Sequence, residues 1–196
     1  MTKRVENVQP LRTKEEIQNM ILALRRGNGA YPKRPEIAER DVLLFLIGIN
    51  TGLRVNDIVR LKVKDVKKDT FLIREGKTKK QREINVSMLR KEIDSFIEGK
   101  ADHEYLFKSQ KGNKHISTTQ AYRILAEAGK YAGYDYIGTH TMRKTFGYHH
   151  YKQFKDVAIL QEIFNHESPS VTRRYIGIRQ DEINDTLSNF RLGVIE

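Results

Sequence analysis

The sequence contains no cysteine among its 196 residues. This absence excludes disulfide bonds, thiolate metal sites and a cysteine nucleophile, and it is compatible with a reducing cytoplasm. Long apolar runs are also missing, because the longest covers only residues 42–47 and is far too short to cross a bilayer. The first ten residues carry positive charge with no apolar segment behind them, so we expect no secretory signal. We therefore expect a cytoplasmic protein with no membrane partner.

Motifs for metals and nucleotides are missing as well. Six histidines are present, but His149 and His150 are adjacent and would diverge on a helix, and no His-Glu-x-x-His spacing occurs. A glycine-rich loop of the GxxxxGK[ST] kind is not found either. The sequence predicts neither a metal site nor another cofactor.

Acidic side chains are outnumbered by basic ones. The 36 lysines and arginines exceed the 25 aspartates and glutamates, which gives a formal net charge of +11. Such a balance favours a polyanionic partner, and nucleic acid is the leading candidate. Charge alone leaves open a basic protein with a merely solvated surface.

Apolar periodicity predicts a mostly helical fold with one small antiparallel sheet, an α+β class. Thr13 and Glu16 form a capping-box signature before an apolar helical face, so the first helix is expected to begin near Thr13. A second, more buried helix is expected to end at Gly52. Alternating apolar residues predict two strands near residues 71–73 and 84–86. Further helices are expected over residues 88–97, 118–131, 141–151, 156–164 and 181–190.

The domain organisation follows from the uniformity of the chain. No repeat, low-complexity tract or long linker divides it, and its length and hydrophobic fraction of 38% suit one core. We expect a flexible segment over residues 1–12 followed by one domain over residues 13–196.

Two arginines are candidates for binding an anion. Arg54 precedes a short helix, whose free N-terminal donors would favour a phosphate beside the guanidinium. His140 and Arg143 are three residues apart, so on a helix both would project from one face toward one ligand. The ordinary alternatives are a surface arginine and a local polar contact.

A tyrosine and a basic turn complete the candidate set. Ser168 and Pro169 are a typical helix start, and this places Tyr175 about two turns into a short helix, where a half-buried packing role is the alternative. Lys77 lies at the tip of the expected hairpin, from which a long cationic side chain can reach a bound backbone. Three further cations lie near it in the hairpin: Lys79, Lys80 and Arg82. A solvated turn is the alternative, and the pattern alone does not choose among the lysines.

In order along the chain, TGLRVNDIVRL, the turn EGKTKK, HTMR, FNHESPSVTRRY and the last helix resemble the tyrosine recombinase, or phage integrase, family. The resemblance covers about residues 13–190. Its specificity lies in the ordered set, which ends with a histidine nine residues before a tyrosine. It implies the catalytic-domain fold of that family.

The resemblance also implies roles for individual residues. Arg54 and Arg143 match the arginines that clamp the scissile phosphate, and Tyr175 matches the nucleophile. The remaining matches are the hairpin lysine, the two histidine positions and a supporting acidic position, which fall on Lys77, His140, His166 and Asp57. We expect further DNA contacts from the other hairpin cations and from Lys144.

Three departures from the family pattern are visible. Asn165 stands where glycine is frequent, but asparagine tolerates the left-handed geometry that ends a helix. Lys144 stands where histidine is frequent, and it adds positive charge near the site. Family members usually carry a separate N-terminal DNA-clamping domain, whereas only about a dozen residues precede the first expected helix here, so we expect that core-binding domain to be absent.

The implied function is site-specific recombination of double-stranded DNA, for integration or excision, through a 3′-phosphotyrosyl intermediate. We expect a homo-oligomer, a tetramer, on DNA, and a monomer is compatible with the free protein. The apolar spacing of residues 181–190 suggests docking on a neighbouring subunit, with packing inside the same subunit as the alternative. The competing functions are a catalytically silent DNA-binding regulator on this fold and a strand relaxation like that of type IB topoisomerases.

Overall fold

The computed structural model describes residues 8–27, 33–77 and 79–193. It confirms a mostly helical fold with a small antiparallel sheet, in which Thr70 pairs with Asn85 and Arg74 with Gln81. The elements in chain order are α1 (Lys14–Arg26), α2 (Pro35–Thr51), α3 (Val55–Ile58), the 3-10 helix η1 (Val63–Val66), β1 (Thr70–Arg74), β2 (Gln81–Asn85), the 3-10 helix η2 (Ser87–Leu89), α4 (Arg90–Ile97), α5 (Thr118–Tyr131), α6 (Thr139–Phe154), α7 (Val157–Phe164), α8 (Pro169–Ile176) and α9 (Ile178–Ser188).

The expected start of the first helix and the expected end of the second are confirmed, whereas α6 and α9 begin two and three residues earlier than expected. The Thr13 hydroxyl accepts a hydrogen bond from the Glu16 amide at 3.0 Å, and the Glu16 carboxylate accepts one from the Thr13 amide at 2.9 Å. At the end of α2, Gly52 has a φ of 64°, a left-handed geometry that suits glycine. A side chain there would also overlap the Phe146 ring, because a Cβ would lie 2.5 Å from it.

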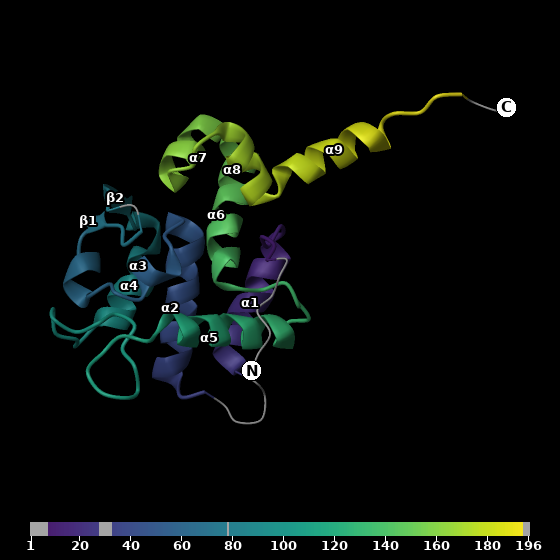
Figure 1. The fold of residues 1–196 in the computed structure, drawn as a ribbon. Coiled ribbons are helices and arrows are strands. Elements are labelled where there is room, and N and C mark those ends of the chain that lie inside the picture. Colours follow the sequence, from purple (N-terminus) through teal and green to yellow (C-terminus); the bar gives the residue numbers. More distant parts are fainter. Residues whose placement is uncertain (1–7, 28–32, 78, 194–196) are drawn as a thin grey trace.

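Helix α2 is the centre of the fold. It packs between α1 and α6, and the strands lie to one side of it (Figure 1). The large apolar core gathers around α2, whereas a smaller apolar cluster joins α6 to α7 and α8 through Tyr148, Leu160, Phe164 and Ile176. Gly48 gives α6 its close approach to α2, because a Cβ at this position would lie 2.4 Å from the Met142 sulfur.

The N-terminal segment differs in part from the expectation of a flexible stretch over residues 1–12. Residues 1–7 lie outside the described part of the chain, but residues 8–12 pack along α6. The Leu11 side chain is fully buried, its amide donates to the Thr145 hydroxyl at 2.9 Å, and its carbonyl lies 3.0 Å from His149 Nε2. An apolar side chain that fills the core therefore fixes this segment, which we call the N-terminal strap (residues 8–12).

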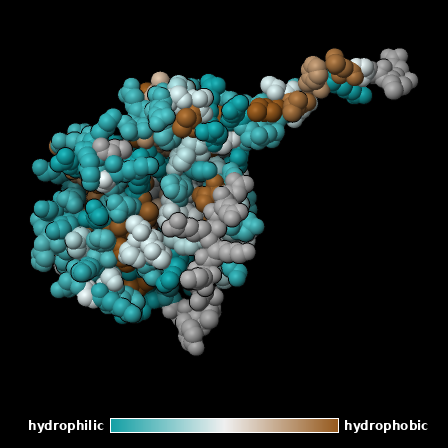
Figure 2. Space-filling view, viewed as in Figure 1, coloured by the Kyte–Doolittle hydropathy of each residue, from teal (hydrophilic) through white to brown (hydrophobic). Residues whose placement is uncertain are grey.

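The last helix extends away from the body, and its exposed surface includes hydrophobic residues (Figures 1 and 2). Its base is held by an ion pair between Arg12 and Asp181 and by a hydrogen bond from the Tyr151 hydroxyl to Glu182 at 3.0 Å. Further along, Leu187 is 64% exposed and Phe190 is 66% exposed. We call residues 178–193 the C-terminal arm. Among the described helices, none combines the length and apolarity needed to cross a membrane.

Replacing Gly48 with alanine is expected to lower the free energy of unfolding by about 1–3 kcal/mol, because the new methyl group would overlap buried Met142. Without that overlap, alanine would stabilise the helix by about 1 kcal/mol. Urea denaturation measures the difference, with Glu39→Ala on the exposed face of α2 as the control. A Gly48→Ala protein at least as stable as the native one would contradict this account of the α2–α6 contact.

Candidate active site

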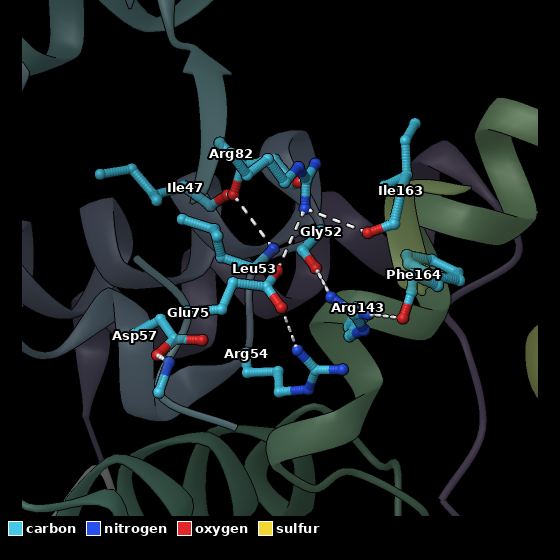
Figure 3. A network of polar contacts seen from close by, with 12 residues as sticks. Ile47, Gly52, Leu53, Arg54, Asp57, Glu75, Arg82, Arg143, Ile163 and Phe164 are labelled. Atoms are coloured by element: carbon cyan, nitrogen blue, oxygen red, sulfur yellow. Dashed lines mark hydrogen bonds and ion pairs between the residues drawn. The ribbon is translucent and has the colours of Figure 1, made fainter. Parts of the chain in front are cut away.

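Arg143 is a buried cation held by the ends of two helices. Its guanidinium, 3% exposed, donates to the Gly52 carbonyl and to the Phe164 carbonyl, the latter at 3.0 Å (Figure 3). These carbonyls lie at the C-terminal ends of α2 and α7, where backbone acceptors lack helical donors. Burial lowers the Arg143 pKa to about 10, so the side chain remains charged at neutral pH.

Arg54 lies beside Arg143 and directly precedes α3, as the sequence predicted. Its Nη1 lies 2.5 Å from the Glu75 carboxylate, and its side chain is only 20% exposed. The positive charge of Arg54 contributes to lowering the pKa values of Arg143 and Tyr175. The charges of both candidate arginines therefore act on Tyr175.

Tyr175 lies in α8 next to both candidate histidines. Its hydroxyl is 3.1 Å from His140 Nδ1, and its ring meets the His166 ring edge to face at 5.0 Å between centroids. Burial raises the Tyr175 pKa, and the charges of Arg143 and Arg54 partly oppose that rise. The phenol is therefore protonated at neutral pH and has a hydrogen-bond partner for its proton.

Both histidines are neutral at physiological pH. Loss of solvent and the positive charge of Lys144 lower the His140 pKa, and in the tautomer protonated at Nε2 the neutral ring accepts the Tyr175 hydroxyl proton at Nδ1. Burial, followed by the charge of Arg143, lowers the His166 pKa to about 4. His166 Nδ1 lies 3.0 Å from the Thr172 hydroxyl, which fixes the ring above Tyr175.

The hairpin brings Lys77 to the same region. Lys77 is exposed, and its charge contributes to lowering the pKa values of both His140 and His166. The turn is tied to α3, because the Gly76 amide donates to buried Asp57 at 2.9 Å. Asp57 is thus hydrogen-bonded to the lysine-bearing turn.

The four residues expected as additional DNA contacts are placed differently from one another. Lys79 is exposed, and Lys80 Nζ reaches the Asn165 side-chain oxygen at 2.5 Å. Lys144 Nζ donates to the Val8 carbonyl at 2.7 Å. The Arg82 guanidinium turns inward and donates to the Thr51 carbonyl at 2.9 Å. The Arg82 side chain therefore contacts the end of α2 instead of pointing into solvent, because its position on β2 faces that helix end.

Glu75 is the residue of this site that the sequence reasoning missed. It is 4% exposed and pairs with Arg54, although it lies in a turn otherwise rich in exposed cations. In the sequence, the only indication of this residue was that a single carboxylate stands at the start of the basic turn EGKTKKQR. Within the described ranges, no group of three or more histidine, aspartate or glutamate side chains could hold a metal ion.

Comparisons with known proteins identify the family of this chain. The model of the Phage integrase family matches residues 12–182. A probable integrase/recombinase, YoeC of Bacillus subtilis, is 49% identical over 176 residues, which cover 89% of this chain and 92% of YoeC. The tyrosine recombinase XerA of Pyrococcus furiosus is 30% identical over 92% of this chain, but the match covers only 61% of XerA.

Solved structures show the same fold. A crystal structure of XerA recombinase matches 99% of this chain and 68% of its own with a TM-score of 0.69 at 21% identity. A lambda integrase dimer, residues 75–356, bound to a core site matches with a TM-score of 0.65 at 19% identity, over 99% of this chain and 65% of that one. The family match and the named relatives place this chain in the tyrosine recombinase class of enzyme. This chain belongs to the phage integrase family.

The pKa of His166 predicts a specific titration. Its ring proton signals in NMR should keep neutral-imidazole positions down to about pH 5 and shift near pH 4, with His166→Gln as the assignment control. The unfolded chain protonates this histidine near pH 6.5, so protonation favours unfolding as the pH falls through that window. A titration midpoint at or above pH 6.5 would refute the proposed surroundings of His166.

Proposed function

We propose that this chain cleaves and rejoins DNA strands as the catalytic part of a site-specific recombinase, in DNA integration or excision. The observation that carries the proposal is the Tyr175 hydroxyl, 3.1 Å from His140 Nδ1 and beside the guanidinium groups of Arg143 and Arg54. A nucleophile, a base and an anion clamp thereby meet at one place.

The two arginines would bind the scissile phosphate. Attack on a phosphodiester increases negative charge on its non-bridging oxygens, and guanidinium groups stabilise that charge with directed donors. Arg143 is held by backbone carbonyls and Arg54 by Glu75, so both are positioned before DNA arrives. Such preorganisation removes the cost of ordering them during the reaction.

Tyr175 would attack the phosphorus and form the 3′-phosphotyrosyl bond. Its raised pKa means that the hydroxyl must lose its proton during attack, and neutral His140 is positioned to accept it. Lys77 would protonate the departing 5′ oxygen, and His166 would orient the phosphate. Because the covalent bond conserves the energy of the phosphodiester, a 5′ hydroxyl can reseal the strand without ATP.

The competing functions are less favoured. Phosphate binding alone does not require a tyrosine hydroxyl paired with a neutral histidine, which argues against a silent regulator. Strand relaxation shares the cleavage chemistry, but the relatives reported above are named recombinases or integrases rather than topoisomerases.

Double-stranded DNA is the proposed partner, and a tetramer is the proposed working assembly, with a monomer free in solution. Structures with the same fold include a lambda integrase dimer on a core site and a lambda integrase tetramer on a Holliday junction. The exposed apolar side chains of the C-terminal arm support docking on a neighbouring subunit. We further propose that the protein acts in the cytoplasm.

Replacing Tyr175 with phenylalanine is expected to reduce covalent protein–DNA adducts by roughly 1,000-fold or more, because the attacking oxygen is removed. Nicked suicide substrates analysed on a denaturing gel without added metal provide the measurement. Tyr131→Phe, at an exposed tyrosine of α5, is the matched control and should leave adduct formation intact. Adducts formed by Tyr175→Phe would rule out this nucleophile.

Changing Leu187 and Phe190 together to glutamate is expected to lower cooperative binding of a second subunit to DNA by about tenfold or more, because charge replaces an apolar docking face. Both side chains are exposed, so the subunit itself should stay folded. Gel-shift titrations measure cooperativity, with Asn184→Glu, an exposed position of the same C-terminal arm, as the control. Unchanged cooperativity and strand exchange would count against docking of the arm in trans.

A further inference from the structure

Glu75 is a buried carboxylate that the reaction scheme above leaves without a task. It directly follows β1, and its backbone closes the hairpin turn: its amide donates to the Lys80 carbonyl at 3.0 Å, and its carbonyl accepts from the Lys79 amide at 2.9 Å. Its side chain, 5% exposed, points toward Arg54 and Arg82 (Figure 3). A carboxylate placed there is costly unless cations pair with it.

The partners of Glu75 are two of the three guanidinium groups in the site. One carboxylate oxygen lies 2.5 Å from Arg54 Nη1, and the other lies 3.8 Å from Arg82 Nη1. Arg82 in turn donates to the Thr51 carbonyl at the end of α2. Glu75 therefore links the hairpin, the end of α2 and the start of α3 in one polar network.

Glu75 also supplies the countercharge of this cluster. The guanidinium groups repel one another, since the charge of Arg54 lowers the pKa values of both Arg82 and Arg143. Glu75 opposes both of these effects. The negative charge of Glu75 thus offsets part of the repulsion among the guanidinium groups in the DNA-free protein. A bound phosphate would offset it in the same way.

We propose that Glu75 is a positioning residue, which fixes one edge of the Arg54 guanidinium so that the remaining donors face the phosphate, and which ties the Lys77 turn to that arginine. The inference rests on the proposed function. Two consequences follow in opposite directions: the carboxylate repels the phosphate and so weakens DNA binding, but it aligns Arg54 and so accelerates cleavage. If the role of Glu75 were purely structural, its loss would damage the site and lower DNA affinity and the cleavage rate in parallel.

Glu75→Gln removes the charge while keeping the shape of the side chain. We expect its single-turnover cleavage to be about 10- to 100-fold slower than that of the native chain, a loss typical of a misplaced catalytic group. DNA affinity, measured by fluorescence anisotropy in a Tyr175→Phe background, should be equal or tighter. Glu83→Gln removes the same charge from the exposed face of β2 and should retain the native cleavage rate.

Glu75→Asp keeps the charge but shortens the side chain by one methylene group, and it decides the matter if Glu75→Gln does not fold. We expect native DNA affinity with slower cleavage. Native cleavage rates in a folded Glu75→Gln or Glu75→Asp protein would overturn the proposal. A parallel loss of affinity and rate in the folded variants would also overturn it, in favour of a structural role.

NMR of arginine side chains in the DNA-free protein separates this inference from the proposed function. The Nη–H signals of Arg54, assigned with Arg54→Lys, should be resolved in the native protein and in Glu83→Gln, but averaged by rotation in Glu75→Gln. Unchanged Arg54 signals in Glu75→Gln would refute the positioning role even in an active enzyme. If the native chain formed no DNA adduct, the proposed function would fail, whereas these signals would still test the contact.

Discussion

The site depends on backbone carbonyls at the ends of two helices. Helices α2 and α7 both end beside the arginine cluster, and their last carbonyls accept hydrogen bonds from Arg143 and Arg82. The C-terminal end of a helix carries partial negative charge, which favours a cation there. The mutually repelling guanidinium groups of Arg54, Arg82 and Arg143, which are partly or fully buried, are thereby held close together.

This arrangement gives Arg143 two tasks at once. Its donors to Gly52 and Phe164 join the large core around α2 to the smaller cluster of α6, α7 and α8, so the arginine is part of the fold as well as of the site. Lysine has a single ammonium head and cannot reproduce the planar fork that spans two carbonyls. The architecture of the fold therefore requires arginine at this position.

The features that could be predicted from the sequence are those determined by neighbouring residues in the chain. The capping box at Thr13 and the left-handed stop at Gly52 are visible in short stretches of sequence, and both occur in the structure. The ordered motifs likewise indicated the family and the candidate residues, which the fold gathers within one region. The inward turn of Glu75 and Arg82 was not predictable, because it depends on the face that a hairpin presents to helices distant in the chain. The burial of Leu11 depends on α6 in the same way.

The N-terminal strap has a consequence for where this polypeptide can be cut or extended. Its Val8 carbonyl accepts a hydrogen bond from Lys144, whose ammonium lies 5.5 Å from the centre of the Tyr175 ring. A recombinant version trimmed to begin at α1 would retain every helix of the described residues, yet it would release Lys144 beside Tyr175 and open the apolar site that Leu11 fills. For protein engineering, the functional boundary of this domain therefore lies upstream of its first helix.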